Sequence, residues 1–306
     1  MKKIGLITHI ADVDGAFPIV LANLIFKDIE IISCEIEEVD EYVETFLKRR
    51  EEFQKLYIVD VNVSEEMAKK LEQIDASFVE IFDHHISREN LNIYPFIHVI
   101  DSRNGKKECG TTLFYEYLKN HYPNSYLENE GLKELIELVR QGDTWDFTDT
   151  YKEKANKLGT LYGLYGREEF IARYTNLIKQ MERFSFTKEE EFLLEIEEGR
   201  IKRYIEEKLE HVKKAVIEGI KVGIVFAEAN RSLLGHRMCE EEDIDIAIVI
   251  HVNRSVSYRA NKEDTDVNTI AKVYGGGGHK HAGGSPLPEH LKEKIIESIF
   301  HDVVWK

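Results

Sequence analysis

Strand-length apolar runs that end beside carboxylates recur in the first part of the chain, and this feature constrains the fold most. Three such runs stand out, at residues 4–8, 56–59 and 78–82. Segments with apolar residues at helical spacing separate them, at 14–26, 38–48 and 65–71. This alternation of strand and helix predicts an α/β fold with a mainly parallel sheet and helices on both of its faces.

The polar residues that follow these runs are expected to meet in space, because ligands gather outside the carboxyl ends of parallel strands. The set comprises His9, Asp12, Asp14, Asp60 and Asp83, extended by the later Asp143 and by His84 of an Asp83-His84-His85 triplet. Carboxylates at close range raise each other's pKa unless a cation neutralises them. Oxygen and imidazole ligands without thiolate favour Mn²⁺, with Co²⁺ or Mg²⁺ as alternatives, and the number of acids suggests two ions.

Each acid also has a structural alternative when it is considered alone. Asp12 and Asp60 could be helix N-caps, and Asp143 could be a turn residue, which are common positions for aspartate. A single histidine is more often a surface or core residue than a ligand. The joint occurrence of these residues at successive strand ends favours the metal interpretation.

Length and composition favour two domains, since 306 residues exceed what one core usually organises. Thr187 and the charged residues after it open a helical pattern with one apolar stripe, and an apolar strand pattern restarts at residues 222–226. We therefore predict a larger metal-binding domain at 1–186, a connecting helix at 187–218 and a smaller α/β domain at 219–306.

The formal net charge of −16 argues against a broad electrostatic grip on extended duplex nucleic acid. A nucleic-acid substrate should therefore be short or held locally. Cys34, Cys109 and Cys239 are scattered, as expected of reduced cytosolic thiols. No apolar stretch approaches the ~20 residues of a membrane span, so we expect a cytoplasmic protein without a membrane partner, and a homodimer is left open.

A second motif lies far from the acids. Four consecutive glycines, Gly275 to Gly278, precede His279. Glycines allow positive φ angles and a close approach of the backbone, so successive N–H groups can form an anion-binding nest. The alternative is a turn that ends a helix at residues 268–274. The sequence favours a phosphate or nucleotide site.

Taken together, these motifs resemble the DHH phosphoesterase family with the first type of DHH-associated C-terminal domain. The resemblance covers most of the chain and rests on ordered motifs: His9-Ile10-Ala11-Asp12-Val13-Asp14, Asp60, Asp83-His84-His85, Asp143-Thr144, and the glycine cluster that runs to Gly284. His9 stands one position closer to Asp12 than in many members, and Trp145 replaces a common glycine. Both features resemble the oligoribonuclease branch, which degrades very short RNAs.

The resemblance implies roles for individual residues. One metal ion would be held by His9, Asp12 and Asp60, and a second ion by Asp14, Asp60, His84 and Asp143. His85 would contact the scissile phosphate or assist the leaving group, and Asp83 would orient the neighbouring histidines. The implied substrate contacts are Arg259, Gly276, Gly277, Gly278 and His279, which would place substrate binding in the smaller domain.

The expected function is manganese-dependent hydrolysis of short single-stranded oligonucleotides to nucleoside 5′-monophosphates by a two-metal mechanism. Other enzymes with the same site remain alternatives: a 3′-phosphoadenosine 5′-phosphate phosphatase, or a phosphodiesterase for linear or cyclic dinucleotides. A pyrophosphatase or polyphosphatase is disfavoured by the glycine cluster. A non-catalytic nucleotide sensor is the alternative from another class of protein.

Overall fold

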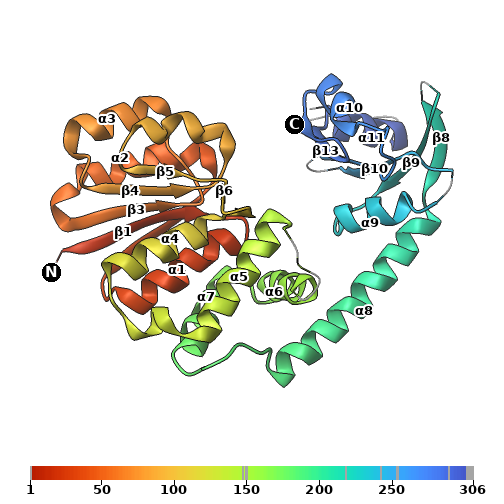
Figure 1. The fold of residues 1–306 in the computed structure, drawn as a ribbon. Coiled ribbons are helices and arrows are strands. Elements are labelled where there is room, and N and C mark those ends of the chain that lie inside the picture. The colour runs from red at the N-terminus through yellow and green to blue at the C-terminus, as the bar shows by residue number, and fades with distance from the viewer. Residues whose placement is uncertain are drawn as a thin grey trace. The chain divides into compact units, whose positions relative to one another are not determined.

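The structure is a computed structural model that describes residues 2–146, 148, 151–217, 219–241, 243–252, 255–288 and 290–300, with only the backbone of His279 and Lys292. The chain divides into two compact units, residues 1–194 and 195–306 (Figure 1). Each unit has its own sheet. The predicted division at residues 186 and 218 stays a prediction.

The first unit is built on a five-stranded sheet in which every neighbouring pair is parallel. Its strands are β1 (Lys3–His9), β2 (Ile29–Cys34), β3 (Phe53–Val59), β4 (Val79–Asp83) and β5 (Ile97–Val99). In the strand order β2-β1-β3-β4-β5, the chain adds β2 on one side of β1 and the later strands on the other, so the order of addition switches between β1 and β3. Ligands of such sheets bind outside the carboxyl ends of the strands at this switch. The predicted α/β class with a mainly parallel sheet is confirmed.

Helices cover both faces of this sheet (Figure 1). One face packs against α1 (Val13–Ile25) and α4 (Gly110–His121), and the same core extends to α5 (Glu130–Thr144), α6 (Lys152–Tyr165) and α7 (Arg167–Ile178). The other face packs against α2 (Val39–Lys48) and α3 (Glu65–Asp75). Alternate residues of β3 enter the two cores: Tyr57 and Val59 on one side, Leu56 and Ile58 on the other. This alternation explains why residues 56–59 of β3 are all apolar.

A small hairpin follows the sheet, formed by β6 (Ser102–Arg103) and β7 (Lys106–Lys107). Its two loop residues, Asn104 and Gly105, have φ angles of 51° and 79°. Asn-Gly is the preferred pair for a tight hairpin with two left-handed residues, so the sequence did carry a signal for it. Short 3₁₀ helices lie at Ile36–Glu38, Arg50–Glu52, Ile86–Ile93 and Ser125–Glu128.

The second unit contains a six-stranded mixed sheet in the order β12-β13-β11-β10-β9-β8. The strands are β8 (Lys213–Ile217), β9 (Ile220–Phe226), β10 (Ile246–His251), β11 (Ser255–Arg259), β12 (Gly277–His279) and β13 (Ala282–Pro286). The helices are α9 (Arg231–Met238), α10 (Val267–Val273) and α11 (Leu291–Ile299). The smaller α/β domain is therefore present as an architecture.

Helix α8 (Lys188–Glu210) includes the boundary between the two units. The backbone N–H of Glu190 donates to the Thr187 hydroxyl at 3.1 Å, and the N–H of Thr187 donates to the Glu190 carboxylate at 2.8 Å. This reciprocal capping box confirms Thr187 as the start of the helix. Further along, Ile205 packs in the core of the second unit.

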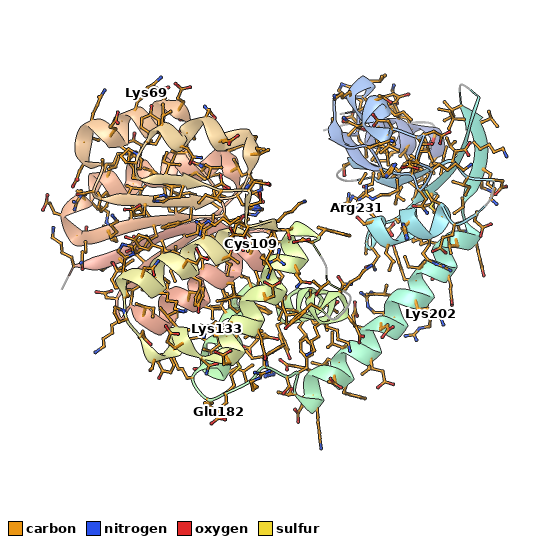
Figure 2. The ribbon with its side chains drawn as sticks, in the orientation of Figure 1. Lys69, Cys109, Lys133, Glu182, Lys202 and Arg231 are labelled. Carbon is orange, nitrogen blue, oxygen red and sulfur yellow. The ribbon has the colours of Figure 1, made fainter. Side chains whose placement is uncertain are left out.

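The three cysteines are free thiols. Cys109, labelled in Figure 2, is fully buried just before α4. Burial raises the pKa of Cys109 well above its usual value and raises that of Cys34 to about 11. Thiols held neutral in this way pack as small apolar groups. Among the described residues, no helix is long and apolar enough to cross a membrane.

Candidate functional site

The loop between β1 and α1 carries the first histidine and two of the aspartates. Asp12 caps α1, because its Oδ1 accepts a hydrogen bond of 2.9 Å from the N–H of Gly15. Its other oxygen, Oδ2, lies 3.5 Å from Nδ1 of His9. The N-cap alternative is therefore correct for Asp12. Only one carboxylate oxygen is used for capping, and the other oxygen faces His9.

This loop is braced by groups that the sequence did not identify. The guanidinium of Arg167, at the start of α7, donates to the carbonyls of Ile10 (2.9 Å) and Gly15 (3.0 Å) and to the Ser33 hydroxyl (2.7 Å). The Thr8 hydroxyl also donates to the Gly15 carbonyl at 2.6 Å. No sequence signal near residue 167 points to the loop, because the contact spans more than 150 positions.

Asp14 is buried and is held by the N-terminus of α4. Its two carboxylate oxygens accept hydrogen bonds from the backbone N–H groups of Gly110 (2.7 Å) and Thr111 (2.9 Å). A helix N-terminus carries unsatisfied N–H groups and a partial positive charge, so it stabilises a carboxylate there. The segment at residues 101–112, which the sequence left without an assignment, therefore positions an acid of the site.

Asp60 follows β3 and is also buried, with a φ angle of 63°. A positive φ is uncommon for a residue other than glycine, and such strain concentrates at functional sites. Its Oδ1 lies 3.3 Å from Nε2 of His84, and its Oδ2 lies 3.6 Å from Nδ1 of His9. Asp60 thus lies between the two histidines.

Asp83 orients the rest of its triplet. Its Oδ1 accepts hydrogen bonds from the backbone N–H groups of His84 (2.8 Å) and His85 (3.2 Å) and contacts Nδ1 of His85 at 2.7 Å. Its Oδ2 accepts one from the Asn62 amide at 3.0 Å. Burial alone would raise the pKa of Asp83, but its bonds with His85 and Asn62 lower it overall. The hydrogen bond between Asp83 and His85 in turn raises the pKa of His85.

Asp143 lies in the last turn of α5, so it is helical and not a turn residue. Its Oδ2 is 3.4 Å from Nε2 of His84. Both atoms are buried and have no hydrogen-bond partner among the described residues. Buried polar atoms without partners are costly. The Asp143 and His84 atoms face each other, so they mark a place for a bound group.

The ligand-type atoms form three groups whose members lie within 4.8 Å of one another. The groups are His9, Asp12 and Asp60; Asp14, His84 and Asp143; and Asp60, His84 and His85. The structure therefore brings together all six residues predicted to bind metal. Asp83 is absent from the three groups, consistent with a supporting position.

The pKa values of several of these side chains are shifted by burial and by neighbouring charges. Burial, followed by the charges of Asp60 and Asp143, raises the pKa of Asp14 well above its usual value. Burial is also the first cause that raises the pKa of Asp143, to about 6. Hydrogen bonds to Asp12 and Asp60 raise the pKa of His9 to about 10. A divalent cation bound here would offset the repulsion between these carboxylates, and the carboxylate and imidazole set fits such an ion.

The predicted substrate contacts lie in the second unit. Arg259 ends β11, and its guanidinium donates to the Tyr258 carbonyl (2.8 Å), the Gly283 carbonyl (3.4 Å) and the Ser232 hydroxyl (2.7 Å). Strand β13 pairs with β11 on one side and with β12 on the other, so the arginine and the glycine cluster share one end of the sheet. The His279 side chain lies outside the described residues.

Two of the four glycines, Gly276 and Gly278, are required by close backbone packing. A Cβ at Gly276 would lie 1.9 Å from the Gly284 carbonyl oxygen, and one at Gly278 would lie 2.4 Å from that of Ala282. The N–H groups of Gly275 and Gly276 bond to carbonyls at the end of α10. The helix-ending alternative therefore accounts for two of the glycine N–H groups. Contact of Gly276, Gly277 or Gly278 with a phosphate stays a prediction.

Comparison with known proteins gives a consistent result. Residues 3–142 match the DHH family, N-terminal domain. The chain is 32% identical over 299 residues to the oligoribonuclease NrnB of Bacillus subtilis (strain 168), covering 94% of this chain and 74% of that protein.

Solved structures show the same fold at low identity. A pGpG-specific phosphodiesterase, PggH from Vibrio cholerae, is 15% identical with a TM-score of 0.51, over 98% of this chain and 97% of that one. An exonuclease RecJ bound to manganese is 14% identical with a TM-score of 0.53, over 97% and 89%.

Proposed function

The chain belongs to the DHH family and is a metal-dependent phosphoesterase, and we propose that it hydrolyses short oligonucleotides to nucleoside 5′-monophosphates with two Mn²⁺ ions bound. The observation that carries this proposal is the meeting of six carboxylate and imidazole side chains at the carboxyl ends of parallel strands. The similarity to an oligoribonuclease along 94% of the chain supports the choice of substrate.

Each of the two ions has its own set of candidate ligands in this proposal, and the two sets share one residue. One set is His9, Asp12 and Asp60, and the other is Asp14, Asp60, His84 and Asp143. Asp60 belongs to both sets, because its two oxygens face different histidines. When bound, such ions neutralise charge at a phosphoryl centre and provide a nucleophile at neutral pH. The oxygen-rich ligand set with imidazoles favours Mn²⁺, with Co²⁺ or Mg²⁺ as alternatives.

His85 is the proposed proton donor. Asp83 holds its Nδ1, which leaves Nε2 as the nitrogen that can contact the substrate. The pKa of His85 is raised first by its hydrogen bond to Asp83, which favours the imidazolium. An imidazolium can donate to the phosphate or to the departing 3′ oxygen as the phosphoester bond breaks. The side chain of His85 is half-exposed, as contact with a substrate requires.

The substrate is expected to be short because the protein has no net positive charge with which to hold a long strand. With a formal charge of −16, phosphate binding has to be local. The proposed local contacts in the second unit are Arg259, Gly276, Gly277, Gly278 and His279. A guanidinium suits a phosphate oxygen pair geometrically. A homodimer stays a prediction.

The test is product analysis with purified protein, Mn²⁺ and end-labelled RNAs of two to five nucleotides. We expect release of nucleoside 5′-monophosphates, with activity reduced by at least ~10²-fold in Asp60→Asn. The matched control is Asp28→Asn, an exposed aspartate that should behave like wild type. Absence of mononucleotides, or an Asp60→Asn variant with wild-type activity, would contradict the proposal.

The same assay separates the alternatives. Parallel reactions contain short DNA, 3′-phosphoadenosine 5′-phosphate, and linear and cyclic dinucleotides at equal concentration. Faster turnover of one of these than of short RNA would replace the substrate assignment but keep the metal site. Nucleotide binding by calorimetry in Mn²⁺ without turnover of any substrate would instead indicate a sensor.

A further inference from the structure

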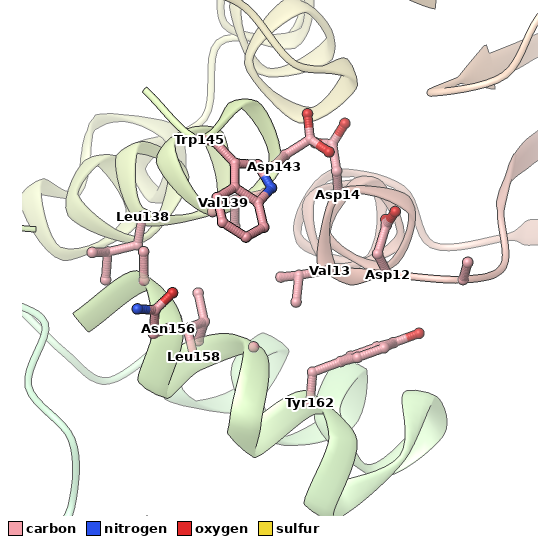
Figure 3. A pocket seen from close by; sticks show the side chains of 14 residues that line it. Asp12, Val13, Asp14, Leu138, Val139, Asp143, Trp145, Asn156, Leu158 and Tyr162 are labelled. Carbon is pink, nitrogen blue, oxygen red and sulfur yellow. The ribbon is translucent and has the colours of Figure 1, made fainter. Parts of the chain in front are cut away.

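A cavity of about 390 Å³ opens beside the candidate metal centre, between α1, α5 and α6 (Figure 3). The carboxylates of Asp12, Asp14 and Asp143 line one side of it. The remaining wall is largely apolar and includes Trp145 and Tyr162. All lining residues belong to the first unit. Its volume falls within the range of about 300–1,000 Å³ that is usual for small-molecule pockets.

Trp145 occupies an unusual position in this wall. It follows the last residue of α5 with a φ angle of 56°, a left-handed conformation that bulky residues rarely adopt. Its side chain is 74% exposed, although an indole is usually well buried. An unusual backbone conformation that presents a large ring beside an acidic centre favours a role in contact with a ligand.

Tyr162 supplies a second ring on another side of the cavity (Figure 3). Its position is fixed, because its hydroxyl donates to the Ile10 carbonyl at 3.3 Å and its ring packs edge-to-face on Phe170 at 5.3 Å. Asn156, which carries both a donor and an acceptor on its amide, also lines the cavity. Beside its carboxylates, the pocket thus combines aromatic faces with a neutral amide.

These properties fit a nucleobase better than any other part of a nucleotide. Away from the acids, the described wall of the cavity has no cationic side chain for a second phosphate, whereas a base is uncharged, has two apolar faces and is polar at its edges. Aromatic side chains bind bases by stacking, largely without regard to sequence, because every base has a π-face. The acids at one side fix the orientation, with the phosphate toward the metal residues and the base toward the rings.

We propose that this cavity binds the base of the nucleotide that is released as the 5′-monophosphate, with the base stacked on Trp145. The inference rests on the proposed function and adds a base site within the first unit. Trp145 is accordingly a substrate-binding residue that the sequence marked only as a departure from glycine. Tyr162 limits the width of the site, and Asn156 is placed to contact a base edge.

The test compares two probes that differ only by the base: adenosine 5′-monophosphate and ribose 5-phosphate, each titrated in Mn²⁺. The chain has two tryptophans, so a Trp305→Phe background leaves Trp145 as the only one. We expect adenosine monophosphate to quench the Trp145 fluorescence and ribose 5-phosphate to leave it unchanged. By calorimetry the nucleotide should bind about tenfold more tightly, as expected for one stacked base.

Two substitutions refine the result. Trp145→Ala should weaken binding of adenosine monophosphate about tenfold and leave ribose 5-phosphate unaffected, while Trp145→Phe should retain most of the affinity. Phe192→Ala, which truncates an exposed aromatic ring on α8, is the matched control and should change neither affinity. Equal losses for the two probes in Trp145→Ala, or no quenching, would overturn the proposal.

The two proposals fail in different ways. If the enzyme releases mononucleotides from short RNA but binds both probes equally, the base site is wrong and the proposed function stands. If no oligonucleotide is hydrolysed but adenosine monophosphate still binds through Trp145, the proposed function is wrong and the base site stands.

Discussion

Substitution of Gly110 by alanine tests the central packing argument of the site. Gly110 is the first residue of α4, and its N–H donates to the buried Asp14 carboxylate at 2.7 Å. A Cβ at this position would lie 2.7 Å from the Asp60 Cβ and 2.9 Å from the Asp60 Cα. One added methyl group therefore presses on Asp60 and disturbs the helix end that holds Asp14.

The magnitude follows from these distances. Carbon atoms pack best at about 3.5–4.0 Å, so the added methyl group overlaps Asp60 by roughly 1 Å. Overpacking of this kind costs about 1–3 kcal/mol. Moving α4 away also weakens the two N–H bonds to Asp14, and a hydrogen bond to a charged group contributes about 1.5–3 kcal/mol. Alanine returns less than about 1 kcal/mol of helix propensity. We expect a net loss of about 2–4 kcal/mol.

The assay is thermal and urea unfolding of the metal-free protein, followed by calorimetric titration of Mn²⁺. At about 2–4 °C per kcal/mol, Gly110→Ala should melt roughly 4–16 °C below wild type. Its Mn²⁺ affinity should fall by about 10–100-fold, because the groups that hold the ligands in place have shifted. Gly163→Ala is the control: no atom lies within 4 Å of its added Cβ, so it should gain about 0.5–1 kcal/mol.

An unchanged melting temperature together with an unchanged Mn²⁺ affinity for Gly110→Ala would refute this reasoning. Such a result would mean that α4 can move away from Asp60 at no cost. A stability loss without a change in Mn²⁺ affinity would show that the contact is structural and that Asp14 and Asp60 do not bind the ion.

Three further predictions follow from the structure. Arg167→Gln should lower the Mn²⁺ affinity by about 10–100-fold in calorimetry, because it removes the bonds that hold the β1–α1 loop, whereas Arg200→Gln on exposed α8 should not. Burial would raise the pKa of Glu80, but its bonds with His98 and Lys55 lower it overall. The ionised Glu80 therefore stabilises the folded protein above the unfolded pKa of about 4.3, and this stabilisation is lost as pH falls through the lower folded pKa. Glu80→Gln should therefore be less stable than wild type to urea at pH 7 but nearly equal to it at pH 3. Mn²⁺ at 100 times its Kd should stabilise wild type by about 2.7 kcal/mol, an effect that chelator should reverse and that Asp60→Asn should lack.

The sequence predicted the central strands better than the edge strands, for a physical reason. Strands β1, β3 and β4 are largely buried on both faces, so most of their residues are apolar. The edge strand β2 is only partly buried, and β5 has three residues. Neither had a pattern that separated it from a loop. Both strands of the hairpin, β6 and β7, were also missed, although Asn104-Gly105 marks their turn.

The site divides in the same way. The candidate ligands could be found because carboxylates after apolar runs come together whenever the strands are parallel. The groups that hold these ligands could not be found. Arg167 reaches the β1–α1 loop from α7, and Gly110 reaches Asp14 from α4, at separations of about a hundred residues or more. Such contacts depend on how the helices dock, which no local pattern encodes.

The sequence by itself therefore determined the class of fold, the set of acids and histidines, and their family. Tertiary structure decided how these residues are used: Asp60 between two histidines, Asp14 on a helix N-terminus, Asp83 turned away from the cluster toward His85 and Asn62. It also placed Trp145 beside a cavity. The reason is that periodicity records which side of an element is buried, whereas ligand geometry depends on the order of strands and the docking of distant helices.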